Sequence, residues 1–251
     1  MEKLICPICK DLEWVYDKTT NTAIPCRCQE QKRMDRRIKF GNLPETLKNA
    51  TFENFKTEYY TSDTSKQYIA YALKQIKVWV QESERFMEQG VGLYIYSNAK
   101  GSGKTRIVAS LANCLMLEKN IPVKFMTTLQ IIQEIKNSWD EENGSESRLL
   151  DNLATVKILI VDDLGVEMHG GKKNWVEDRF YQIINERMLR QLPTVYTSNI
   201  AIEKLPYQER IISRIEGNSI KIMFPEESVR KTIAMENQKE MFELIKVGTK
   251  K

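Results

Sequence analysis

The stretch 97–105 reads SNAKGSGKT and lies between an apolar run and a segment with helical periodicity. It matches the phosphate-binding pattern G-x-x-x-x-G-K-[ST] in its last three residues, Gly103, Lys104 and Thr105. Asn98 stands where the pattern has its first glycine, and Gly101 adds a second flexible residue. Because asparagine tolerates a positive φ better than most non-glycine residues, Asn98 can still make the turn. The stretch therefore predicts a phosphate-binding loop with one variant position.

The residues on either side of this loop predict a strand before it and a helix after it. The apolar run 91–96 is typical of a buried strand, and the apolar residues of 105–119 recur at helical spacing. In a strand–turn–helix unit, backbone N–H groups converge on a phosphate, Lys104 reaches the β- and γ-phosphates, and the Thr105 hydroxyl coordinates Mg²⁺. The residues expected to contact the nucleotide are Asn98, Ala99, Lys100, Gly101, Ser102, Gly103, Lys104, Thr105 and Arg106.

Strands and helices alternate through the rest of the chain. The periodicity predicts strands at 91–96, 122–126, 157–162 and 194–197, and helices at 68–80, 105–119, 129–139, 148–153 and 175–189. Such alternation is typical of a parallel sheet with helices on both faces, where ligands bind beyond the carboxyl ends of the strands. We therefore expect an α/β domain over 46–251, with the loop at one of those ends.

Polar side chains follow two of the predicted strands. The stretch 157–165, KILIVDDLG, ends in Asp162 and Asp163, and Asn199 follows the strand 194–197. Because adjacent residues of a strand face opposite sides, we expect Asp162 to lie in the outer shell of the magnesium, where it holds a metal-bound water, and Asp163 to polarise the attacking water. The Asn199 carboxamide would orient water near the γ-phosphate. Acids and asparagine at strand ends are also ordinary turn formers, which is the alternative interpretation.

Four of the five cysteines lie in the first 28 residues, as C-P-I-C and C-R-C. Paired thiolates in a reducing compartment more often hold metal than form disulfides, and four of them suit tetrahedral Zn²⁺. We expect a zinc site made by Cys6, Cys9, Cys26 and Cys28, although the tight C-x-C pair leaves open that one of them does not ligate. Free thiols or a redox pair are the alternative. With the basic segment that follows, this zinc-binding module occupies 1–45.

The composition bounds the remaining possibilities. The chain has 251 residues, 38 Lys and Arg against 34 Asp and Glu, and a formal net charge of +4, which permits contact with nucleic acid without requiring it. Its apolar runs are shorter than a membrane span, and its start lacks the long apolar stretch of a signal peptide. We therefore expect a cytoplasmic protein with no membrane contact.

Five stretches together resemble a known family. They are ATFENF at 50–55, GSGKT at 101–105, ILIVDDLG at 158–165, WVEDRFYQIINERMLRQLPTVYTSNI at 175–200 and RIISRI at 210–215. The chain resembles, over roughly 49–230, the AAA+ ATPases of the DnaC/DnaI-type replicative helicase loader family and their IstB-type transposon relatives. The resemblance implies an AAA+ P-loop NTPase fold with a five-stranded parallel sheet flanked by helices.

The same resemblance assigns expected roles to single residues. The segment with Phe52 and Phe55 would pack near the adenine, or alternatively its two aromatic residues anchor a linker to the core. Asn199 corresponds to the sensor that reads the γ-phosphate, and Arg230 to the second sensor. Arg214 resembles the arginine finger that one subunit offers to the ATP of its neighbour, and Arg210 is the alternative. For the arginines, a surface salt bridge is the rival interpretation.

The resemblance also implies a function. It implies a Mg²⁺-dependent ATPase that self-associates into an ATP-dependent ring or spiral and loads the hexameric replicative helicase onto single-stranded DNA, with slow hydrolysis as a switch. The N-terminal module would grip the helicase, and Lys136, Trp139 and Arg148 could contact DNA, unless 129–153 is a solvated helix pair. The alternative is an IstB-type transposition regulator that assembles on double-stranded DNA. The cysteine module favours the loader.

Two further side chains are open to two interpretations each. Arg187 lies on the same helical stripe as Val176 and Phe180, so it either reaches across a subunit boundary or ends the helix. His169, the only histidine, lies in a Gly-rich loop, and we expect a mobile loop near the nucleotide there rather than a catalytic histidine.

Overall fold

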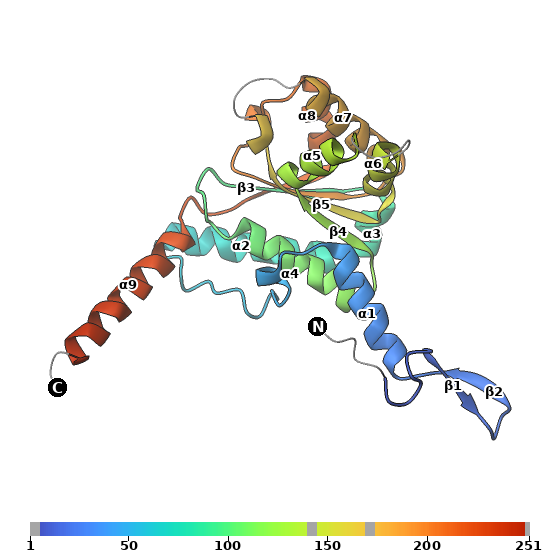
Figure 1. Ribbon diagram of the computed structural model, residues 1–251. Coiled ribbons are helices and arrows are strands. Elements are labelled where there is room, and N and C mark those ends of the chain that lie inside the picture. The colour runs from blue at the N-terminus through green and yellow to red at the C-terminus, as the bar shows by residue number, and fades with distance from the viewer. Residues whose placement is uncertain (1–5, 140–144, 169–173, 249–251) are drawn as a thin grey trace.

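The computed structural model describes residues 6–139, 145–168 and 174–248, and a parallel sheet lies at its centre (Figure 1). The five strands of this sheet lie in the order β4-β5-β6-β3-β7, and each pairs in parallel with its neighbours. Their bounds are Gly92–Tyr96 (β3), Val123–Thr127 (β4), Ile158–Leu164 (β5), Thr194–Ser198 (β6) and Ser219–Met223 (β7). The predicted α/β fold with a five-stranded parallel sheet is confirmed.

The strand β3 occupies the position in the sheet where the winding of the chain reverses. The chain leaves β3 for the edge strand β4, returns through β5 to β6, and then crosses to β7 on the other side of β3. Leu93 of β3 pairs with Val195 of β6 and with Ile220 of β7. Open α/β sheets bind their ligands beyond the carboxyl ends of the strands at such a reversal. The loop 97–103 follows β3 at that point.

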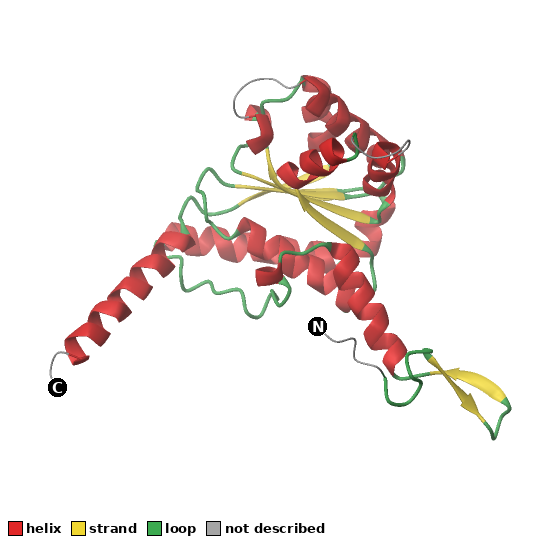
Figure 2. Cartoon of the chain, in the orientation of Figure 1, coloured by secondary structure: helices red, strands yellow, loops and turns green. Residues whose placement is uncertain are grey.

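Helices cover both faces of the sheet (Figures 1 and 2). One face carries α2 (Asp63–Gln81) and α4 (Lys104–Leu117), whose apolar residues form one buried cluster with the sheet. The other face carries α5 (Thr128–Asn137), α6 (Ser145–Thr155), α7 (Asn174–Leu189) and α8 (Glu209–Gly217), which form a second cluster. A short helix, α3 (Ser83–Glu88), follows α2. The sheet is therefore buried on both faces, as continuous apolar strands require.

The N-terminal segment extends away from this core (Figure 1). The antiparallel hairpin of β1 (Trp14–Asp17) and β2 (Thr22–Pro25) is followed by α1 (Cys28–Gly41), which packs against α4 and β4. Gly41 makes this contact close, because a Cβ there would lie 2.7 Å from the Met116 sulfur. Single-turn 3₁₀ helices at Glu45–Leu47, Val166–Met168 and Ile202–Lys204 complete the connections. The end of α1 is thus fixed to the core, while the hairpin projects from it.

The C-terminal helix α9 (Val229–Gly248) also extends away from the core (Figure 2). Most of its side chains are exposed. None of the helices in the described part of the chain combines the length and the apolar composition that a membrane crossing requires. His169 and the part of the predicted DNA-contacting segment at 140–144 lie outside the described residues.

Candidate nucleotide-binding site and metal centre

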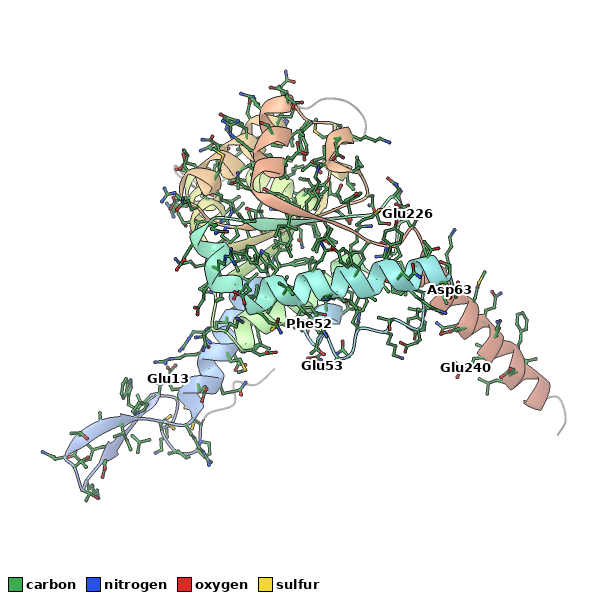
Figure 3. The ribbon with its side chains drawn as sticks, turned by 180° about the vertical axis from the view of Figure 1, so that it is seen from behind. Glu13, Phe52, Glu53, Asp63, Glu226 and Glu240 are labelled. Atoms are coloured by element: carbon green, nitrogen blue, oxygen red, sulfur yellow. The ribbon has the colours of Figure 1, made fainter. Side chains whose placement is uncertain are left out.

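Two glycines give the loop after β3 its conformation. Gly101 and Gly103 have φ angles of 79° and 93°, in the left-handed region that favours glycine. A Cβ at Gly103 would also lie 2.8 Å from the Tyr60 hydroxyl oxygen. Asn98 has no positive φ, so the predicted reason for its tolerance in the loop is wrong. Its backbone N and its Nδ2 each donate instead to Glu226 Oε1, at 3.0 Å, on the connection between β7 and α9 (Figure 3).

The Lys104 ammonium group joins the loop to the end of β6. Its Nζ donates to the carbonyl oxygens of Ser97 (3.2 Å) and Ala99 (3.1 Å), to Ser102 Oγ (3.2 Å) and to Asn199 Oδ1 (3.0 Å). Lys104 is 5% exposed, and this burial lowers its pKa to about 8. The structure therefore brings together Lys104 and Asn199, which lie 95 residues apart in the sequence.

The carboxylate of Asp162 faces the first turn of α4. Thr105 Oγ1 donates to Asp162 Oδ1 at 3.1 Å, and Thr197 Oγ1 of β6 donates to the same oxygen at 2.5 Å. Asp162 is 2% exposed, and burial raises its pKa to about 6. A hydroxyl and a carboxylate oxygen at this spacing are the hard ligands that Mg²⁺ prefers, so the residues present fit the predicted magnesium site.

Asp163 is separated from Asp162 by an irregularity in β5. The register with β6 shifts between Val161 and Leu164, and Asp163 has a φ of 59°. The backbone N of Asp163 donates to Thr197 Oγ1 at 2.9 Å. Simple strand alternation, on which the division of roles was predicted, therefore does not hold at these two residues, because a bulge sets the direction of Asp163. Its negative charge acts to raise the pKa of Lys104, against the effect of burial.

Aromatic residues from the segment before α2 lie against the loop. The Tyr60 hydroxyl donates to a loop carbonyl at 2.7 Å, and a Cβ at Gly103 would lie 3.2 Å from Phe55 Cζ. Arg106 Nη2 donates to Asn54 Oδ1 at 2.8 Å and so ties this segment to α4. Phe52 packs against the apolar core on the side of α2 and α4 (Figure 3). Of the two phenylalanines in this segment, the one that the structure places at the loop is thus Phe55.

Arg230, at the start of α9, lies over the loop. A Cβ at Gly101 would be 3.0 Å from Arg230 Cγ and Cδ, and 3.0 Å from Ser228 Oγ. Lys100, the neighbouring loop residue, is exposed. The structure thus places Arg230, an exposed residue, beside the predicted phosphate site.

Arg214 and Arg210 lie on α8, where they contact α7 rather than the loop. Arg214 Nε donates to Asn185 Oδ1 at 3.0 Å, and its Nη2 donates to the Tyr181 hydroxyl at 3.1 Å. Arg210 forms an ion pair with Asp178, with an N–O distance of 3.1 Å. Arg214 lies beside residues at the amino ends of β3, β6 and β7, whereas the loop follows the carboxyl end of β3, so Arg214 does not contact the loop of its own chain.

The connection between β7 and α9 contacts the loop, and sequence analysis did not predict this contact. Ser97 Oγ donates to the Pro225 carbonyl at 2.8 Å. Glu227, beside Glu226, accepts from Thr61 N at 2.8 Å and from Thr61 Oγ1 at 2.7 Å, just before α2 begins. These contacts join residues more than 120 positions apart, so no local signal could have revealed them.

Arg187 is buried inside the domain, so the interpretation that it reaches across a subunit boundary is wrong. Its guanidinium donates to Thr194 Oγ1 (2.8 Å) and to the carbonyls of Leu153 (2.9 Å), Val156 (2.8 Å) and Pro193 (2.7 Å). Burial lowers its pKa to about 10. Arg187 therefore holds the end of α6, the end of α7 and the start of β6 together.

The four N-terminal cysteines converge between the hairpin and α1. Their sulfur atoms all lie within 4.8 Å of one another, with Cys6–Cys26 at 3.9 Å and Cys9–Cys28 at 3.3 Å. A tetrahedral zinc site with Zn–S bonds of about 2.3 Å requires sulfur atoms about 3.8 Å apart. The geometry and the chemistry of the four thiols therefore fit the predicted Zn²⁺, and none of the four points away from the cluster.

Comparison with known proteins agrees with this geometry. The family model described as IstB-like ATP binding protein matches residues 23–209. The chain is 24% identical over 204 residues to the Replicative helicase loader DnaC of Escherichia coli, covering 80% of this chain and 77% of the relative. It is 28% identical over 196 residues to the Replicative helicase loader DnaI of Bacillus subtilis, covering 78% of this chain and 58% of that protein.

A solved structure shows the same fold. The crystal structure of DnaI superposes with a TM-score of 0.58 at 25% identity, covering 77% of this chain and 99% of the solved chain. The fold is therefore that of the AAA+ ATPases, as predicted. With a family model that matches well over half of its length, this chain belongs to the IstB-like ATP-binding proteins, among which it is similar to the DnaC- and DnaI-type loaders.

Proposed function

We propose that this protein is an ATP-dependent loader that places the hexameric replicative DNA helicase onto single-stranded DNA. One observation carries the proposal: the same chain combines a nucleotide site assembled at the carboxyl edge of the sheet with a projecting four-cysteine module. The relatives named as replicative helicase loaders align with 78% and 80% of the chain, which supports the same client.

The site residues have distinct roles in the proposed ATP cycle. Lys104 exchanges its carbonyl and amide partners for the β- and γ-phosphates, and Asn199, its partner at 3.0 Å, is thereby placed to read the γ-phosphate. Thr105 and Asp162 hold Mg²⁺, which when bound supplies positive charge opposite the phosphates. Asp163 polarises the attacking water. Slow hydrolysis then serves as a switch between two assembly states rather than as a source of product.

The arginines complete the proposed site from two directions. Arg230 acts from α9 of the same chain, where its side chain already lies over Gly101. Arg214 acts from the neighbouring subunit, because in its own chain it lies at the opposite edge of the sheet from the loop. A contact of this kind is head-to-tail, and head-to-tail contacts generate rings or open spirals. ATP is therefore expected to promote self-association.

The projecting N-terminal module is the proposed contact with the helicase. We assign 1–45 to this module and 46–251 to the ATPase domain. The hairpin exposes Trp14 and Tyr16 on one face, at 49% and 59%, and exposed aromatic residues are typical anchors of protein interfaces. Zn²⁺ would hold this small hairpin together, since an isolated two-stranded hairpin is only marginally stable.

Single-stranded DNA is the proposed second client. Trp139, just beyond the end of α5, is 51% exposed, and its ring makes an edge contact with Trp175, with centroids 5.0 Å apart. An exposed indole can stack on a base, and Lys136 and Arg148 lie on α5 and α6 for contact with phosphates. The Trp139 Nε1 donates to Glu146 Oε2 at 3.1 Å, so part of this surface is also held by internal contacts.

Light scattering after size-exclusion chromatography tests the helicase contact. The full chain is mixed with the hexameric helicase of the same organism, with and without ATP and Mg²⁺. Two controls are a chain that lacks residues 1–27, which leaves α1 and its packing on the core intact, and Lys104→Ala. We expect a complex with the full chain that is lost on deletion, and that no longer responds to ATP in Lys104→Ala.

Absence of any complex in every nucleotide state would contradict the loader proposal. ATP-dependent assembly of the chain on double-stranded DNA would then favour the alternative, an IstB-type transposition regulator.

A further inference from the structure

Two arginines of α8 lie over one aromatic ring of α7. The guanidinium carbons of Arg210 and Arg214 are 4.5 Å and 4.8 Å from the centroid of the Tyr181 ring. The two arginines are one helical turn apart, and the Nη1 of Arg214 donates to the Arg210 carbonyl at 2.7 Å. A ring face attracts a cation without neutralising it. Tyr181 is thus the shared support of both guanidinium groups.

The two arginines differ in how their charge is compensated. Arg210 is paired with the Asp178 carboxylate at 3.1 Å. Arg214 donates only to uncharged acceptors, which are the Asn185 amide oxygen, the Arg210 carbonyl and the Tyr181 hydroxyl. Within the described residues, no carboxylate oxygen lies within 4.0 Å of the Arg214 guanidinium. Three uncharged acceptors therefore orient the Arg214 guanidinium, and no carboxylate competes with a phosphate for it, which is what binding a phosphate requires.

The face of α7 that makes these contacts also fixes α8 itself. Glu177, Tyr181 and Asn185 are spaced four residues apart and so lie on one face of α7. Glu177 is fully buried, and it accepts from the backbone N and the Nε2 of Gln208, both at 3.1 Å. Gln208 is the N-cap residue immediately before α8. Successive turns of α7 thus contact α8 in three ways: Glu177 binds its start, Tyr181 supports its two arginines, and Asn185 accepts from the Nε of Arg214.

We propose that Tyr181 is a positioning residue for Arg214, the arginine that the proposed function assigns to the nucleotide site of the neighbouring subunit. The proposal rests on the proposed function, because it requires ATP hydrolysis at a head-to-tail interface. The Tyr181 ring supports the Arg214 guanidinium, and the Tyr181 hydroxyl fixes its rotation. Arg210 is already paired with Asp178 and is therefore less available to bind a phosphate.

Mixing variants in pairs tests this assignment, because a residue that acts in trans is replaced by a neighbour. The ATPase rate is measured with single-stranded DNA for Lys104→Ala, Arg214→Ala, Arg210→Ala, Tyr181→Leu and Tyr181→Phe, alone and mixed. Binding of a fluorescent ADP to each variant is the second readout. We expect Arg214→Ala to lose at least about 100-fold in rate, since a trans arginine contributes about 10³–10⁵-fold in the best-studied NTPases. Arg210→Ala should lose less than about threefold, because its charge is already paired.

The ATPase rate of Tyr181→Leu should be lower by about tenfold or more. The rate of Tyr181→Phe should lie between those of Tyr181→Leu and the unmodified protein, since the ring remains and only one hydrogen bond is lost. All these variants except Lys104→Ala should bind ADP normally. Tyr181→Leu should regain activity when mixed with Lys104→Ala, which donates an intact Arg214, and should gain nothing when mixed with Arg214→Ala. A general loss of structure at Tyr181 would not produce this pattern.

Different outcomes overturn different parts. If Arg214→Ala and Lys104→Ala do not restore each other, the trans arrangement of the proposed function fails, and this inference with it. If these two variants do restore each other, three other results would show that the positioning role of Tyr181 is wrong. The first is that Arg214→Ala restores the activity of Tyr181→Leu, and the second is that neither Arg214→Ala nor Lys104→Ala restores it. The third is that Tyr181→Phe and Tyr181→Leu both keep full activity. A loss in Arg210→Ala equal to that in Arg214→Ala overturns the choice between the two arginines.

Discussion

Replacement of the buried Arg187 should destabilise the domain by several kcal/mol. Arg187→Met keeps a side chain of similar length but leaves the four acceptors of the guanidinium, three carbonyls and the Thr194 hydroxyl, without their donor. At about 2 kcal/mol for each unsatisfied buried acceptor, the loss is about 8 kcal/mol. Removal of the buried charge offsets part of it. Burial lowers the pKa of Arg187 from 12.5 to about 10, and a shift of 12.5 − 10 = 2.5 corresponds to about 3 kcal/mol.

The expected net loss in the free energy of unfolding is therefore about 5 kcal/mol, measured by urea denaturation with circular dichroism at pH 7.5 without nucleotide. Arg190→Met is the matched control. Arg190 lies on the turn just after α7, and its ion pair with Glu186 is half exposed, so its loss should cost less than about 0.5 kcal/mol. An Arg187→Met protein that unfolds within about 1 kcal/mol of the unmodified protein would refute the view that these four contacts carry stability.

Three more perturbations follow from the site geometry. Gly103→Ala should abolish binding of fluorescent ADP, because an alanine would be strained at a φ of 93° and its Cβ would lie 2.8 Å from the Tyr60 hydroxyl; normal affinity would contradict this view of the loop. Because burial lowers the pKa of Lys104 to about 8, its ammonium charge should be lost as the pH rises through 8. The affinity for ADP without Mg²⁺ should therefore fall by up to about tenfold from pH 7 to 9. An affinity that stays constant to pH 9 would place the pKa of Lys104 well above 8. The full chain should retain about one Zn²⁺ per molecule by mass spectrometry under native conditions, and Cys9→Ser should lose it and the helicase complex together; a metal-free chain that still binds the helicase would separate the cysteine cluster from that function.

Local signals predicted the centre of the site. The loop at 97–105, the acids at the end of β5 and Asn199 after β6 each lie at the end of a strand. Because parallel strands bring their carboxyl ends to one edge, the pattern predicted that these residues share one site, and the structure places Lys104 beside Asn199 and Thr105 beside Asp162. The clustering of the cysteines along the sequence likewise predicted their convergence in space.

The parts that sequence analysis missed depend on distant contacts. The strand β7 is partly exposed and lies at the edge of the sheet, so it lacks the continuous apolar run that marks the inner strands. The contact of Glu226 with Asn98 joins residues 128 positions apart. This contact, and not the predicted left-handed turn, accounts for the conformation of Asn98 in the loop. The bulge at Asp163 is a backbone feature that residue types do not reveal.

The most direct test of the central claim is transfer of the helicase to closed circular single-stranded DNA. A ring cannot thread onto a circle without being opened, so stable association of the hexameric helicase with the circle reports loading itself. The proposal predicts that the full chain with ATP gives helicase bound to circles after isolation by gel filtration, and that Lys104→Ala and the chain that lacks residues 1–27 give none above helicase alone. Equal amounts of helicase on the circles with and without this protein would contradict it.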